Sequence, residues 1–177
     1  MNDMARAKEL FLQYGGDAFQ MDRQGVYDEY LAFNIAKDTE AEWREDWILR
    51  VLPDMTERPI ADDRYYKLKQ LIRTGRDLKC FRMFIDFVLD VMSRTDTFSL
   101  LLFAEAIAAI SLSFKQRRVP GYREWIAKNA ILRIIEYVAN RNVNVDVYYR
   151  TVDYLQDILT EKEIRKRFAD LKTQITA

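Results

Sequence analysis

The stretch FSLLLFAEAIAAISLSF, from Phe98 to Phe114, decides the fold that this sequence predicts. It contains no Gly or Pro, and its side chains are apolar on every side of a helix except at Glu105 and three Ser. A helix that is apolar all round has to be covered by other elements. We therefore expect this stretch to be the buried central helix of a globular protein.

Crossing a membrane is the less favoured interpretation of the same stretch. Its 17 residues are at the lower limit for a transmembrane helix. A carboxylate near the helix centre, such as that of Glu105, costs about 2.5–3.5 kcal/mol to insert. The N-terminus, MNDMARAKEL, has no apolar signal region, and a single Cys80 suits a reducing compartment. We expect a cytoplasmic protein with no membrane partner.

Length and composition favour one packed domain, or at most a domain with a small added module. The chain has 177 residues, of which 49% are apolar and 32% charged, with only 5 Gly and 3 Pro, so a turn-rich β sandwich is disfavoured. It contains no His. The commonest general base and metal ligand is therefore missing, which excludes His/Cys zinc sites and imidazole-based triads. No cofactor is expected.

Apolar residues recur at helical spacing on both sides of the central stretch, and they predict an all-α fold of about 8–9 helices in antiparallel pairs. Pairs beginning near 62, 96 and 146 are similar in length to HEAT or armadillo repeats, although they share no side-chain motif. A compact multi-helix bundle around the helix 98–114 explains the pattern equally well. Helices are expected over 3–14, 26–33, 39–52, 62–75, 77–92, 122–140, 146–159 and 160–175, and an irregular or extended stretch over 17–25.

The two ends of the chain carry opposite charge. Residues 1–63 hold 7 Lys/Arg and 15 Asp/Glu, a net charge of −8, whereas residues 64–177 hold 21 and 13, a net charge of +8. The stretch 53–61, with Pro53 and Pro59, is the best linker candidate and lies just before the sign changes. We therefore expect an acidic N-terminal helical subdomain over 1–60 and a basic helical-hairpin domain over 61–177, or one continuous domain.

Two tryptophans in the acidic segment predict a protein-binding surface. Trp43 and Trp47 fall one turn apart on a helix that also carries Glu42 and Glu45. Aromatic anchors rimmed by charge are typical of interface hot spots, although packing of either Trp into a core is the simpler interpretation. The leading hypothesis is a non-catalytic protein-interaction module, not an enzyme. Its partner would be a basic protein or a second copy of the chain.

Basic residues in the second segment give a nucleic-acid hypothesis. They are concentrated over 64–82 and 115–123, where they could follow a phosphate backbone while tyrosines stack on bases. A pI near 6.4 is low for a nucleic-acid-binding protein, so this is the second hypothesis. The cations of this surface include Arg73, Arg76, Arg117 and Arg118, and its tyrosines are Tyr65, Tyr66 and Tyr122.

Glu105 gives a third hypothesis, because its sequence neighbours are apolar. A buried carboxylate takes a partner or has a raised pKa, and Arg82 and Arg133 are the predicted partners if it does not lie on a partly exposed edge. Asp86 and Asp90 could join it in an oxygen-only cluster, which suits magnesium or manganese. The chain would then be a Mg/Mn-dependent all-α hydrolase.

Overall fold

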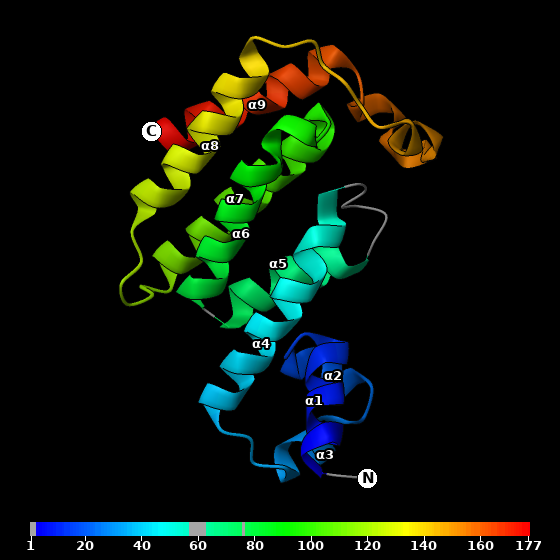
Figure 1. Ribbon diagram of the computed structural model, residues 1–177, viewed down its shortest axis with the longest axis vertical. Helices are drawn as coiled ribbons and strands as arrows, with labels where there is room; N and C mark the ends of the chain where they lie inside the picture. Colours follow the sequence, from blue (N-terminus) through cyan, green and yellow to red (C-terminus); the bar gives the residue numbers. More distant parts are fainter. Residues whose placement is uncertain (1–2, 57–62, 76) are drawn as a thin grey trace.

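The computed structural model describes residues 3–56, 63–75 and 77–177 (Figure 1). These residues form helices and connecting loops without any strand, so the all-α prediction is confirmed. The α-helices are α1 Asp3–Tyr14, α2 Ala18–Arg23, α3 Tyr27–Ala32, α4 Lys37–Val51, α5 Asp63–Gly75, α6 Leu78–Val91, α7 Thr97–Gln116, α8 Glu124–Ala139 and α9 Glu161–Thr176. The 3-10 helices are η1 Leu52–Thr56, η3 Met92–Arg94, η4 Val147–Thr151 and η5 Asp153–Ile158.

Helix α7 is the centre of the body formed by α5 to α9, as its sequence predicts. It packs against α5, α6, α8 and α9. Its Phe103 ring lies edge-on to Phe84 and Phe87, with centroids 6.0 and 6.3 Å away. By length and composition α7 could cross a membrane, and among the described residues it is the one helix that could. Its packing inside the body accounts for the same apolar composition. A helix in contact with four others fits a compact bundle, and no contact identifies the HEAT or armadillo type.

Helices α1 to α3 lie on α4 at the opposite end of the molecule from α8 and α9 (Figure 1). Phe11 of α1 is the centre of this region, with its ring edge-on to Trp43 at 5.7 Å and 6.3 Å from Tyr30. Gly16 ends α1 with a φ of +65°, and a Cβ there would come within 2.7 Å of the Phe11 ring. The apolar core is continuous from Phe11 into the body. Independent folding of residues 1–60 stays a prediction, and residues 57–61 of the expected linker lie outside the described residues.

Two N-terminal expectations were wrong. The stretch 17–25 contains the short helix α2, because the Asp17 carboxylate accepts hydrogen bonds from the Phe19 and Gln20 amides and caps it. Helix α4 begins at Lys37 after Ala36, without a side-chain cap, rather than at Thr39. Acidic residues in its first turn, which include Asp38, stabilise that end through the helix dipole.

The segment 146–159 was also predicted wrongly, because it forms η4 and η5 instead of an α-helix. Val152 has extended backbone angles and separates the two turns. The bend allows Tyr149 to be fully buried, with its hydroxyl 2.9 Å from that of Ser99 on α7. Helix α9 follows Thr160, as expected for the range 160–175, and the Thr160 hydroxyl caps it by accepting a hydrogen bond from the Glu163 amide at 3.2 Å.

Candidate interaction surfaces

The tryptophans of the predicted protein-binding surface face inward. Trp43 is 5% exposed and packs on Phe11, whereas Trp47 is partly buried against the same core. The packing interpretation therefore describes both side chains. Trp125 at the start of α8 is the tryptophan on the surface, with most of its side chain exposed. Its position on a mostly apolar helix gave no signal in the sequence.

The acidic residues of α4 do lie together on the surface. Asp38, Glu42, Asp46 and the exposed Leu49 recur at three- and four-residue spacing, so they share one face of the helix. We name these four residues the α4 acidic face. The Lys8 ammonium approaches the Asp46 carboxylate at 3.2 Å. Asp38 and Glu42 are exposed and make no ion pair with any residue that the structure describes.

Helices α2 and α3 also carry exposed acidic residues beside exposed apolar ones. On α2, the exposed Phe19 precedes Asp22 by one turn, and on α3 Asp28 precedes the exposed Leu31 by one turn. Asp22 and Asp28 are also exposed, and neither forms an ion pair within the described ranges. Apolar and acidic groups therefore alternate on both short helices.

Two ion pairs join the acidic and basic segments within the described part of the chain. Arg44 contacts Asp77 at 3.2 Å, with both side chains 12% exposed, and Lys79 contacts Glu45 at 2.5 Å. The hydrogen bond from Lys79 to Glu45 raises the pKa of the lysine. In one pair the acid comes from the N-terminal segment and in the other from the C-terminal segment. Together they leave the opposite net charges of the two segments unchanged.

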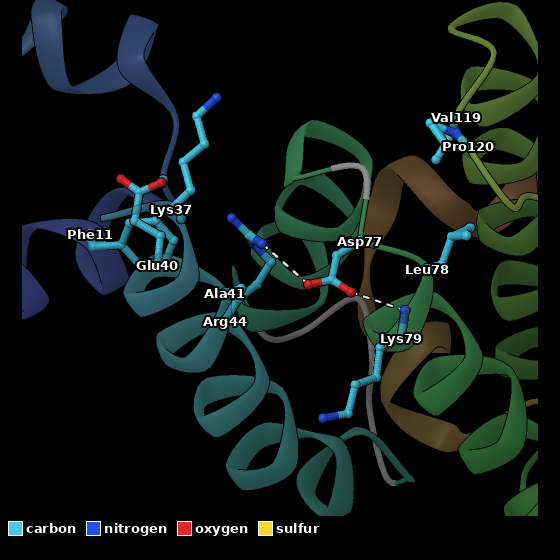
Figure 2. A pocket seen from close by; sticks show the side chains of 12 residues that line it. Phe11, Lys37, Glu40, Ala41, Arg44, Asp77, Leu78, Lys79, Val119 and Pro120 are labelled. Carbon is cyan, nitrogen blue, oxygen red and sulfur yellow. Dashed lines mark hydrogen bonds and ion pairs between the residues drawn. The ribbon is translucent and has the colours of Figure 1, made fainter. Parts of the chain in front are cut away.

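A cleft of about 860 Å³ lies between α4 and the start of α6 (Figure 2). Lys37 lies on the α4 side and Pro120 on the side of the α7–α8 loop. The Arg44–Asp77 pair stands between them. The second Asp77 oxygen caps α6 by accepting the Lys79 and Cys80 amides. Lining groups of both signs give the cleft no strong preference for one charge.

The basic surface is partly assembled as the second hypothesis predicts. Arg117 donates a hydrogen bond to the Arg73 carbonyl at 3.3 Å, which places the loop after α7 at the end of α5. Arg73, Arg117 and Arg118 are exposed and form no ion pair among the described residues. Arg76 and the side chain of Tyr65 lie outside the described residues. Tyr122 is half-buried and hydrogen-bonded to Ser111, so its ring is not an open stacking platform.

Glu105 has a structural partner, but not one of those expected. The Arg167 guanidinium of α9 binds it through three hydrogen bonds of 2.7 to 3.0 Å, whereas Arg82 and Arg133 were predicted. Asp86 and Asp90 lie exposed on α6, away from it. No three His, Cys, Asp or Glu side chains in the described ranges are grouped so that they could hold a metal ion.

Comparison of the chain with protein-family models, curated proteins and solved structures finds no match. Its function is therefore inferred from the chemistry of its own surfaces.

Proposed function

We propose that this chain is a non-catalytic protein-interaction module that binds a basic protein through the α4 acidic face. The observation that supports this most is that the N-terminal segment keeps its net negative charge and the C-terminal segment its net positive charge. Only two ion pairs join the segments in the described part of the chain, and they cancel each other's effect on net charge. Asp38 and Glu42, which form no ion pair among the described residues, are consequently available to a partner.

The composition of the surface favours a protein over a small cation. Leu49 lies within the α4 acidic face, and Phe19 and Leu31 are exposed among the aspartates of α2 and α3. A metal ion needs converging carboxylates, whereas a protein interface combines apolar contacts with a charged rim. Unpaired acids would also speed association with a basic partner by electrostatic steering.

Charge reversal tests the proposal. The wild-type chain and an Asp38→Lys/Glu42→Lys variant would be immobilised and exposed to nuclease-treated lysate of the source cell, and retained proteins identified by mass spectrometry. A Glu136→Lys/Asp170→Lys variant makes the same charge change at exposed, unpaired acids of α8 and α9 and is the matched control.

We expect a basic protein to be retained by wild type and control and lost by the α4 variant. Titration of that purified protein should then show at least tenfold weaker binding to the variant. Equal retention by all three chains would contradict the proposal. A retained protein identical to the chain itself would assign the surface to self-association instead.

A further inference from the structure

A cleft of about 440 Å³ lies where α8 ends and α7 begins, at the end of the body away from the α7–α8 loop (Figure 1). Two arginines line it, Arg94 from η3 and Arg141 from the loop after α8. Hydroxyl and amide side chains make up much of the remaining lining, and Leu100 and Val138 are its buried apolar part. Among the residues that the structure describes, no carboxylate lines this cleft. We name it the arginine cleft.

Hydrogen bonds between Thr97 and Asn144 join the start of α7 to the loop after α8. The Thr97 amide donates to the Asn144 side-chain oxygen at 3.0 Å, and the Thr97 hydroxyl donates to the same oxygen at 2.7 Å. The Asn144 amide in turn donates to the Thr97 hydroxyl at 3.0 Å. Arg165 of α9 also donates to the Arg141 carbonyl at 3.1 Å. The loop is therefore anchored at both ends of the segment 141–144, so binding of a ligand would require little further ordering of the backbone.

Both guanidiniums are accessible to an anion. Arg141 lies over the Tyr137 ring, with its Cζ 4.0 Å from the ring centroid, and forms no ion pair among the described residues. The ring contact holds the guanidinium in place and leaves its N–H donors for a ligand. Arg94 contacts the Asp90 carboxylate at 3.3 Å, with side chains 63% and 76% exposed. Such an exposed ion pair is weak, so Arg94 can exchange it for another anion.

Other acids near the cleft already have partners. The Asp96 carboxylate accepts two amides of the first turn of α7, so it caps that helix. The Glu161 carboxylate accepts a hydrogen bond from Arg165 at 2.7 Å. Ser93 and Asn142, by contrast, line the cleft with exposed side chains that form no hydrogen bond within the described part of the chain. The cleft therefore offers two cations and uncommitted polar groups, and its anion binding depends on side chains rather than on a helix end.

We propose that the arginine cleft binds a small phosphate monoester of about the size of a sugar phosphate. A phosphate monoester carries a charge of about −1.5 to −2 at pH 7, which matches two guanidiniums without a lining carboxylate. A carboxylate has one charge and two oxygens, which a single arginine fork satisfies. The volume lies in the range of small-molecule sites, and the polar lining suits a ligand that carries hydroxyl groups. The cleft shares no residue with the α4 acidic face, so this inference does not rest on the proposed partner.

NMR titration of the nitrogen-15-labelled full chain in phosphate-free buffer tests the proposal, with ribose 5-phosphate as the probe and ribose and inorganic phosphate as comparison compounds. We expect the probe to shift the amides of Asn142 and Asn144 and to bind about tenfold more tightly than either comparison compound, because it alone combines both kinds of polar contact. Arg141→Gln and Arg94→Gln should each weaken binding about tenfold, since each removes charge-assisted hydrogen bonds. Arg141→Lys should weaken it less, because the charge remains but the fork is lost.

Arg150→Gln is the matched control, because Arg150 is an exposed arginine of η4 that does not line the cleft. It should bind like wild type, as should Asp38→Lys/Glu42→Lys, which separates this test from that of the proposed function. Circular dichroism would verify that each variant is folded. No binding of ribose 5-phosphate at millimolar concentration, or unchanged binding by both glutamine variants of the cleft, would overturn the proposal. Equal affinity for inorganic phosphate would overturn it in favour of a site for the free ion, and tighter binding of a phosphoserine peptide in favour of a phosphorylated protein.

Discussion

Helices α7 and α4 are the long helices at the centre of the two regions, and they are built in opposite ways. Of the 20 residues of α7, 11 are buried, and its polar residues are few. Of the 15 residues of α4, only Trp43, Ile48 and Val51 are buried. The body is therefore stabilised by apolar burial around one helix. The N-terminal region depends on a smaller aromatic cluster around Phe11.

This contrast in burial explains which helices can present side chains to a binding partner. A helix that is mostly buried, such as α7, presents little to a partner. Helix α4 packs against α1 on one side and against α5 and α6 near its other end, and it still leaves a face of exposed acidic side chains. Helix α5 lies between these extremes, since it buries Leu68 and Ile72 while it exposes Tyr66 and Arg73.

We expect the largest loss of stability when an aromatic ring is removed from the core of the body. Phe103→Ala would open a cavity between α7 and α6, beside Phe84 and Phe87. Because the site is fully buried, we expect the free energy of unfolding to fall by about 3–5 kcal/mol. Urea denaturation followed by circular dichroism measures it. A loss below about 1 kcal/mol would show that α7 is not the centre of the core.

Trp43→Ala makes the corresponding change in the N-terminal region. The variant loses the edge-on contact with Phe11, and we expect a loss of about 2–3 kcal/mol, because this smaller cluster is less enclosed than the core of the body. Amide hydrogen exchange should accelerate in α1 to α3 while protection in α7 and α8 is retained. Equal acceleration in both regions would mean that they unfold as one unit.

The elements that the sequence predicts well are those set by local chemistry. Asp77 and Asp96 each accept two amides and cap α6 and α7, as aspartates in front of apolar helices should. Helix α2 was missed because Phe19 and Met21 alternate with polar residues instead of recurring at helical spacing. The spacing of Tyr148, Val152, Leu155 and Leu159 suits an α-helix, but two short 3-10 helices form instead and bury Tyr149 and Leu155.

The candidate surfaces were harder to predict, because they depend on contacts between distant residues. The sequence places Glu42 correctly among exposed acids, yet it cannot show which side of α4 Trp43 occupies, since charges lie all round that helix. Tyr66 was predicted to be available for stacking, and its ring is 48% exposed. Glu105 was predicted to pair with Arg82 or Arg133, whereas its partner Arg167 lies 62 positions away in the sequence.

The Glu105–Arg167 pair tests whether charge also contributes inside the body. Glu105→Gln keeps the size of the side chain and removes the charge that accepts three hydrogen bonds from Arg167. The side chains are 35% and 23% exposed, so solvent screens the pair, and we expect a loss of about 1 kcal/mol. Thermal unfolding in low and high salt measures it. A loss as large as that of Phe103→Ala would contradict the view that burial dominates the body.

Surface ion pairs should make the smallest contribution to the free energy of unfolding. We expect that contribution to be similar in the two regions. The hydrogen bond from Arg6 lowers the pKa of Glu29 in the N-terminal region, and that from Lys115 lowers the pKa of Glu124 in the body. A carboxyl whose pKa is lower when folded stabilises the fold above its ordinary pKa, near 4.3, and loses that effect as the pH falls through the lowered pKa.

Carbon-13 NMR titration of the two glutamate carboxyls measures both pKa values. We expect each pKa to lie below the ordinary value, that of Glu29 to return to it in Arg6→Gln, and that of Glu124 to rise part of the way in Lys115→Gln, because Lys128 still lowers it. Stability at neutral pH should change little in either variant, because exposed ion pairs are screened by solvent. A large loss confined to Arg6→Gln would show that the N-terminal region relies on surface charge for its stability. A basic partner that bound Glu29 would then have to replace the ion pair with Arg6.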